Sequence, residues 1–191
     1  MLGDDLEAAA AALRRVTVQV QVGGAGEGSG ILWDRNGLVL TNAHVARATA
    51  GRVRAAGEVF DARLVARDPR SDLAALRIEG HGFEAATPGD LSSLRAGVLV
   101  LAFGHPLGVS NSLAMGVVHD VPRDDAGEPR WIRADIRLAP GNSGGPLADA
   151  GGRLVGINTL VAGGLGHAVP LNVIARFLDW AGLSTPGRRA A

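Results

Sequence analysis

The alternation of apolar and polar positions predicts a chain built mostly of short β-strands. Residues 16–22, VTVQVQV, place valine at every second position, which is the period of a strand with one buried face. An Asn-Gly pair at 36 and 37 separates the apolar runs 28–33 and 38–41 and favours a hairpin. Turn residues separate the further strands that we predict at 52–56, 59–66, 73–78, 98–103, 113–119, 131–138, 153–157, 159–162 and 166–169. Such close spacing is typical of antiparallel sandwiches and barrels.

Two segments have helical periodicity. Residues 4–14 place apolar side chains on one side and acidic residues near the beginning, which predicts a short helix that caps the fold. After Pro170, apolar residues recur at helical spacing until Gly182, which predicts a second helix. The polar segment 84–97 favours a boundary between two subdomains. We therefore expect an N-terminal helical segment 1–15, a first barrel 16–88, a second barrel with the terminal helix 89–182, and a frayed tail 183–191.

Composition indicates one globular unit and points to no charged partner. A chain of 191 residues can bury a substantial core. Its 19 basic and 19 acidic residues cancel, so we expect neither nucleic acid nor an acidic membrane surface as a partner. The absence of cysteine excludes disulfides, a thiol nucleophile and cysteine-ligated zinc. Nothing in the composition calls for a cofactor.

The beginning of the chain does not resemble a secretory signal. Acidic residues stand where such a signal carries positive charge, and the apolar run is alanine. No apolar stretch reaches the roughly 18 residues that a membrane span requires, so we expect no membrane insertion. A leader that had been cleaved or omitted would leave the same sequence, so these observations leave the compartment open.

The stretch APGNSGGPL, residues 139–147, carries the clearest chemistry. Glycines on both sides of Ser143 allow a tight turn that exposes the hydroxyl. A serine nucleophile needs a base, a group that orients the base, and donors for the oxyanion. The pentapeptide GNSGG also matches the nucleophile elbow of α/β-hydrolases, but that fold requires the order Ser, acid, His and alternating strands and helices. The chain offers neither.

His44 and Asp72 are the candidates for base and orienting acid. Among the five histidines His44 stands out, because it lies in TNAHVA, where the predicted strand 38–41 ends, and small residues follow it, so its ring can face a cleft. Asp72 opens the strand 73–78 and can accept a hydrogen bond from the imidazole Nδ1, although a turn cap is the alternative role. The order His44, Asp72, Ser143 predicts a catalytic triad. We expect surface or satisfied core positions for His81, His105, His119 and His167.

No metal site is predicted. The loop after His119 gathers acidic side chains, but they lack the spaced ligand pattern of a calcium loop, and we expect them to be solvated. The residues in question are Asp120, Asp124, Asp125 and Glu128.

Five segments in this order resemble the trypsin-like serine proteases of the HtrA (Deg) group: GSGILWDRNGLVLTNAHVA, DPRSDLAALRI, FGHPLGV, APGNSGGPL and GRLVGINTLVAGGLGHAVPLNVI. The resemblance covers roughly residues 16–178 and implies an all-β fold of two six-stranded antiparallel barrels, with the cleft between them. It implies that His44 and Asp72 lie on the first barrel and Ser143 on the second. It also implies an oxyanion hole formed by the N–H groups of Gly141 and Ser143, with Asn142 between them. The PDZ domain common in the group is expected to be absent, and monomer and trimer both stay open.

The resemblance further implies an apolar specificity pocket. Its walls would be Leu138, Leu160, Val161, Ala162, Gly166 and Ala168. Small apolar walls favour cleavage after small aliphatic residues such as valine, alanine or isoleucine. Arg137 would select acidic residues if it pointed inward, but an unpaired buried guanidinium is costly, so we expect it to face solvent or pair with a carboxylate such as Asp135.

These patterns together predict a serine endopeptidase that cleaves extended or unfolded polypeptides through an acyl-enzyme. A catalytically inactive peptide-binding or chaperone-like module of the same fold is the main alternative, and an esterase without peptide turnover is another. The family resemblance implies an extracytoplasmic location, in the periplasm or cell envelope, whereas the missing signal peptide leaves the cytoplasm open.

Overall fold

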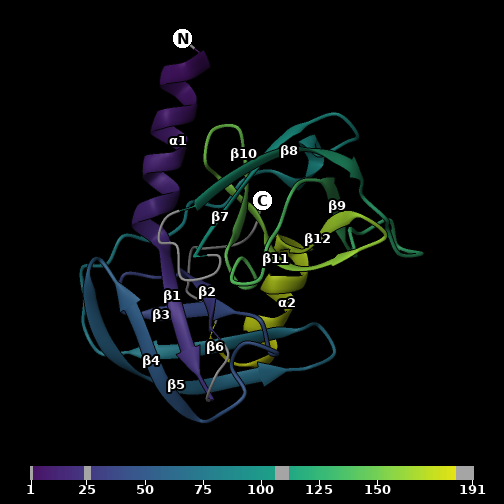
Figure 1. Cartoon of the computed structure of the whole chain (residues 1–191). Coiled ribbons are helices and arrows are strands. Elements are labelled where there is room, and N and C mark those ends of the chain that lie inside the picture. The colour runs from purple at the N-terminus through teal and green to yellow at the C-terminus, as the bar shows by residue number, and fades with distance from the viewer. Residues whose placement is uncertain (1, 24–26, 106–111, 184–191) are drawn as a thin grey trace.

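Two closed antiparallel barrels, each with six strands, make up most of the computed structural model, which describes residues 2–23, 27–105 and 112–183 (Figure 1). The first barrel contains β1 (Thr17–Val22), β2 (Glu27–Leu32), β3 (Leu38–Thr41), β4 (Ala50–Ala55), β5 (Glu58–Asp68) and β6 (Leu73–Ile78). The second contains β7 (Leu99–Gly104), β8 (Ser112–Asp120), β9 (Ile132–Asp135), β10 (Pro146–Asp149), β11 (Leu154–Ala162) and β12 (Leu165–Pro170). The helices are α1 (Leu2–Val16) and α2 (Leu171–Trp180), and a short 3-10 helix, η1 (Leu91–Ser93), precedes β7. The predicted all-β fold with two barrels and two helices is confirmed.

Both barrels have the same strand order. The first reads β1-β2-β3-β6-β5-β4 around the barrel, and the second reads β7-β8-β9-β12-β11-β10 in the corresponding direction. Each strand of the first barrel therefore has a counterpart six strands later. The end of β3 and the loop before β10 come from different barrels, and the site is built where these segments meet.

Burial follows the sequence pattern in β1. Val18, Val20 and Val22 are buried, whereas Gln21 between them is exposed, as the two-residue period predicts. The predicted strand begins one residue later than Val16, because the helix continues to that position. Thr17 then closes the helix by donating its hydroxyl to the Leu13 carbonyl at 2.7 Å.

The sequence pattern assigned two strands of the second barrel incorrectly. It predicted no strand at Pro146–Asp149, which pairs with both β7 and β11. It also divided β11 into two strands, because the polar pair Asn158 and Thr159 interrupts the apolar run. The strand is continuous, and its pairing with β12 shifts register between Asn158 and Leu160. The strand predicted at 131–138 is limited to β9, so the residues after Asp135 lead into the loop that carries Ser143.

The helices cover the second barrel. Ala9 and Leu13 of α1 pack against Leu101, Phe103 and Ala148 of β7 and β10. The helix α2 lies against β11 and β12. A continuous apolar cluster joins the two barrels, and its members include Ile31, Leu40, Leu73, Leu147 and Val155. This shared core fixes the position of one barrel relative to the other.

The predicted boundary at 88/89 falls in the connection between β6 and β7 and stays a prediction. This connection pairs with β11, since the Gly89 N–H donates to the Leu154 carbonyl at 2.7 Å. Of the predicted frayed tail 183–191, residues 184–191 lie outside the described residues. Within the described ranges, neither helix is long and apolar enough to cross a membrane.

Candidate active site

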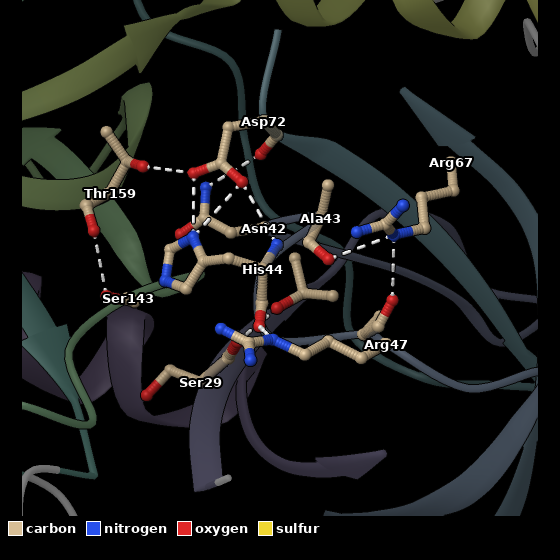
Figure 2. A network of polar contacts seen from close by, with 11 residues as sticks. Ser29, Asn42, Ala43, His44, Arg47, Arg67, Asp72, Ser143 and Thr159 are labelled. Carbon is tan, nitrogen blue, oxygen red and sulfur yellow. Dashed lines mark hydrogen bonds and ion pairs between the residues drawn. The ribbon is translucent and has the colours of Figure 1, made fainter. Parts of the chain in front are cut away.

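Asp72 and His44 meet because β3 and β6 are neighbours in the first barrel, with Thr41 opposite Ala74. The His44 Nδ1 lies 2.8 Å from Asp72 Oδ2 and 3.1 Å from Oδ1 (Figure 2). The backbone N–H of His44 also donates to Asp72 Oδ1 at 3.1 Å. An acceptor at Nδ1 places the ring proton there and leaves Nε2 free to accept a proton. Asp72 therefore orients both the ring and the backbone of His44.

The turn that carries His44 is held from the first barrel. The Arg67 guanidinium of β5 donates from Nε to the carbonyls of Ala43, at 3.0 Å, and Ala46, at 3.1 Å (Figure 2). The Arg47 Nε donates to the His44 carbonyl at 2.7 Å. Charged donors make stronger hydrogen bonds than neutral ones. These hydrogen bonds hold the backbone of residues 43–46 and thereby help to fix the position of the His44 imidazole.

Asp72 combines an uncommon backbone with an ionised side chain. Its φ of +54° lies in the left-handed region, which costs a non-glycine residue about 1–2 kcal/mol. The Asp72 carbonyl accepts hydrogen bonds from Asn42 Nδ2 at 3.0 Å and from the Ala43 N–H at 3.1 Å, which hold this conformation. Burial by itself raises the pKa of the carboxyl, but hydrogen bonds from His44 and Thr159 outweigh it and lower the pKa of Asp72 below its ordinary value of 3.8. The carboxylate is therefore charged at neutral pH.

Several backbone hydrogen bonds hold the turn around Ser143. The Asn142 N–H donates to the Ala139 carbonyl and the Gly145 N–H to the Asn142 carbonyl, both at 3.0 Å. The Gly144 N–H donates to the Asn158 carbonyl at 2.8 Å. Among the described residues, no acceptor is bound to the N–H of Gly141 or of Ser143. These are the two donors that the resemblance assigns to the oxyanion hole, and a hole needs donors that are not already occupied.

The Ser143 hydroxyl does not bond to His44 in this structure. It donates instead to the Thr159 carbonyl at 2.8 Å. Figure 2 shows the His44 ring between Asp72 and Ser143. Catalytic hydrogen bonds are often loose without substrate and tighten when it binds.

Thr159 is the residue of this site that the sequence interpretation missed. Its hydroxyl donates a short hydrogen bond to Asp72 Oδ2, and its carbonyl accepts from Ser143. It therefore joins an acid of the first barrel to a hydroxyl of the second. The available signal was the polar pair Asn158 and Thr159 in an apolar strand, and both are at least 97% buried, with exposures of 1% and 3%. Buried polar residues are usually retained for the hydrogen bonds they make.

An apolar cavity of about 450 Å³ adjoins Ser143. Three of the predicted pocket residues, Leu138, Leu160 and Val161, line it together with Ala139, Pro140, Asn142, Asn158 and Thr159. Gly166 lies beneath Leu138, since an added Cβ would be 2.9 Å from Leu138 Cδ1. Ala168 is buried in the core, and Ala162 is exposed at the end of β11. Arg137 is exposed and does not line the cavity.

The family model of the trypsin-like peptidase domain matches residues 28–157, which is more than half of the chain. The chain belongs to the trypsin-like peptidase family. Within that family, HTRA2 of Drosophila pseudoobscura pseudoobscura, a mitochondrial serine protease, is 37% identical over 166 residues, which cover 81% of this chain and 39% of that protein. HhoA of Synechocystis sp. is 37% identical over 161 residues, or 78% of this chain and 41% of that protein. The chain thus spans about two fifths of the length of these curated relatives.

A solved structure described as HtrA-type protease AlgW with decapeptide superimposes on this chain with a TM-score of 0.81. The two are 27% identical, and the alignment covers 92% of this chain and 67% of the other. The resemblance to the HtrA group is confirmed by these relatives.

Several other histidines and acids of the chain have different environments. His105 is buried, and desolvation lowers the pKa of its ring. Asp120 forms an ion pair with Arg133. Asp124 caps a turn by accepting hydrogen bonds from the N–H groups of Ala126 and Glu128. In the described part of the chain, no three His, Asp or Glu side chains are grouped to hold a metal ion.

Proposed function

We propose that this chain is a serine endopeptidase of the HtrA type. The proposal rests on two features of the site. His44 is hydrogen-bonded to Asp72, and among the described residues the N–H groups of Gly141 and Ser143 in the nearby turn have no acceptor. Ser143 is the nucleophile, His44 the general base and acid, and Asp72 the residue that orients the imidazole and stabilises its charged form. Membership in the trypsin-like peptidase family supports the same assignment.

Proton transfer follows from this geometry. The Ser143 hydroxyl leaves the Thr159 carbonyl, gives its proton to His44 Nε2, and its oxygen bonds to the carbonyl carbon of the substrate. The substrate oxygen becomes an oxyanion and accepts hydrogen bonds from the N–H groups of Gly141 and Ser143. His44 then gives the proton to the leaving amine, and an acyl-enzyme remains. A water molecule attacks this ester with His44 again as the base, which restores Ser143 and releases the carboxylate.

The shape of the cleft supports extended polypeptides as substrates. In the described part of β11, pairing with β10 ends at Ile157, so one edge of Leu160–Ala162 is not paired with another strand. An extended peptide can add to such an edge through its own backbone. The solved AlgW structure is described as a protease with a decapeptide, which supports peptides as ligands of a protein of this type. Unfolded or extended proteins present such segments, and folded proteins do not.

The apolar cavity supports a preference for small aliphatic residues at the cleavage point. None of the described residues that line it has a charged side chain, and Leu138, Leu160 and Val161 form its walls. A matched apolar side chain in such a pocket gains about 1–3 kcal/mol over a mismatched one. A peptide-library cleavage profile tests this preference, and a dominant Glu or Asp at the cleavage point would contradict it.

A fluorophosphonate probe tests the proposed activity, with Ser143→Ala as the matched control. We expect the wild-type protein to be labelled at Ser143 and to cleave unfolded casein. The variant should be unlabelled and lose turnover on the order of a millionfold. Binding of peptide without labelling would support the inactive peptide-binding module instead. Hydrolysis of activated esters without casein cleavage would support an esterase.

A further inference from the structure

Ser29 of β2 connects the first barrel to the turn that carries Ser143. It is fully buried, and all its hydrogen-bonding groups have partners. Its N–H donates to the Ser143 carbonyl at 2.8 Å, and its carbonyl accepts from Thr41 Oγ1 at 2.7 Å. Its hydroxyl donates to the Gly141 carbonyl at 2.7 Å and accepts from the His105 N–H at 3.0 Å. A single side chain therefore contacts the nucleophile turn and the end of β7.

The direction of the Ser29 hydroxyl is determined by these partners. The His105 N–H can only donate, so it occupies a lone pair of Oγ, and the one hydroxyl proton is directed to the Gly141 carbonyl. Ser29 is fully buried, and the hydrogen bond that it donates to the Gly141 carbonyl is itself partly buried. Without this hydroxyl, the Gly141 carbonyl would lose a hydrogen bond that nothing else supplies in the same place.

Gly141 is the residue of the turn that most needs such a restraint. Its φ of +103° is open to glycine, which rotates about its backbone bonds more freely than other residues. Gly141 joins two rigid peptide units, one that contains its N–H and one that contains its carbonyl. A hydrogen bond that holds the carbonyl unit in place leaves the N–H unit only rotation about the two backbone bonds of Gly141 itself.

The surrounding glycines allow Ser29 to approach this closely. A Cβ on Gly104 would lie 3.0 Å from Ser29 Oγ and 2.6 Å from Asn142 Oδ1. A Cβ on Gly145 would lie 3.1 Å from the Ser29 Cβ. The turn is thus packed directly against Ser29, and a displacement on one side is transmitted to the other.

We propose that Ser29 is a positioning residue that holds the Gly141 N–H in the direction required for the oxyanion hole. The proposal rests on the proposed function, because the oxyanion forms only if Ser143 attacks a carbonyl. In this proposal a side chain of the first barrel, Ser29, orients a turn of the second barrel, so the activity depends on how the two barrels are joined. Ser29 itself touches no substrate atom.

The test compares Ser29→Ala and Ser29→Cys with Thr17→Val. Thr17→Val removes one buried hydrogen bond, from Thr17 Oγ1 to the Leu13 carbonyl, away from the cleft. For Ser29→Ala we expect kcat on a peptide substrate to fall about 10- to 100-fold, with KM changed by no more than about 2-fold. The Ki of a peptide boronate, which places an oxygen in the oxyanion hole, should rise by the same factor as kcat falls. Ser29→Cys keeps a weak donor and should lie between wild type and Ser29→Ala.

Thr17→Val should keep the kinetic constants of the wild type, which separates positioning from a general loss of stability. Circular dichroism and urea unfolding establish that each variant is folded. A labelled, active wild type with unchanged kcat and boronate affinity in Ser29→Ala would overturn the proposal alone. A Ser29→Ala variant that loses kcat without weaker boronate binding would also overturn it. A wild-type protein that does not react with the fluorophosphonate would overturn the proposed function and this inference with it.

Discussion

Gly144→Ala tests how closely the nucleophile turn is packed against the first barrel. Gly144 has a φ of +84°, and an added Cβ would lie well inside 3.0 Å of both the Ser29 carbonyl oxygen and Thr41 Oγ1. These two atoms are themselves hydrogen-bonded, at 2.7 Å. The methyl group would therefore have to displace a backbone atom and break this hydrogen bond.

The expected cost follows from the backbone conformation and the crowding. The left-handed φ costs alanine about 1–2 kcal/mol, and overpacking typically adds about 1–3 kcal/mol. We therefore expect Gly144→Ala to lower the free energy of unfolding by about 2–5 kcal/mol. Because the displaced turn carries Ser143, a shift of about 1 Å should also reduce kcat on the order of 100-fold.

Gly57→Ala is the matched control. Gly57 has nearly the same φ, +87°, in the turn between β4 and β5, and a Cβ there would meet no atom within 4 Å. It should lose only the conformational part, about 1–2 kcal/mol, and keep its activity. Equilibrium urea unfolding and peptide hydrolysis measure both variants. Equal losses of unfolding free energy in the two variants would refute the reasoning.

Three further outcomes are expected. Asp72→Asn should lower kcat about 10⁴-fold in a peptide hydrolysis assay, because the amide does not hold the required imidazole tautomer, and near-wild-type turnover would contradict this. Thr159→Val removes one of the hydrogen bonds that lower the pKa of Asp72. A lowered carboxyl pKa stabilises the fold above about pH 3.8, and this stability is lost as pH falls through the lowered pKa. The difference in unfolding free energy between Thr159→Val and the wild type should therefore shrink on acidification. A difference that grows on acidification would be evidence against this role of Thr159. Arg137→Ala should leave a peptide-library cleavage profile unchanged, because Arg137 does not line the cavity, and a new preference would show that it does act there.

Local pattern was enough to predict much of the fold. The alternating valines of β1 and the Asn-Gly turn before β3 depend on neighbouring residues alone, so their signals are visible in the sequence. The glycines around Ser143 pointed to the nucleophile for the same reason, and the order of His44, Asp72 and Ser143 along the chain pointed to the triad. The pattern failed at β10, a strand of only four residues that pairs with the distant strand β7, and at β11, where buried polar residues interrupt the apolar run.

The sequence by itself determined the barrel architecture and the candidate triad, and only the tertiary structure decided which other residues support that site. Thr159 bonds to Asp72 from 87 residues away, and Ser29 bonds to Gly141 from 112 residues away. No local spacing encodes such pairs, because they arise where two barrels meet through a shared core. Alternation and turn residues report short-range preferences, whereas a buried hydrogen bond between barrels depends on the packing of the whole chain.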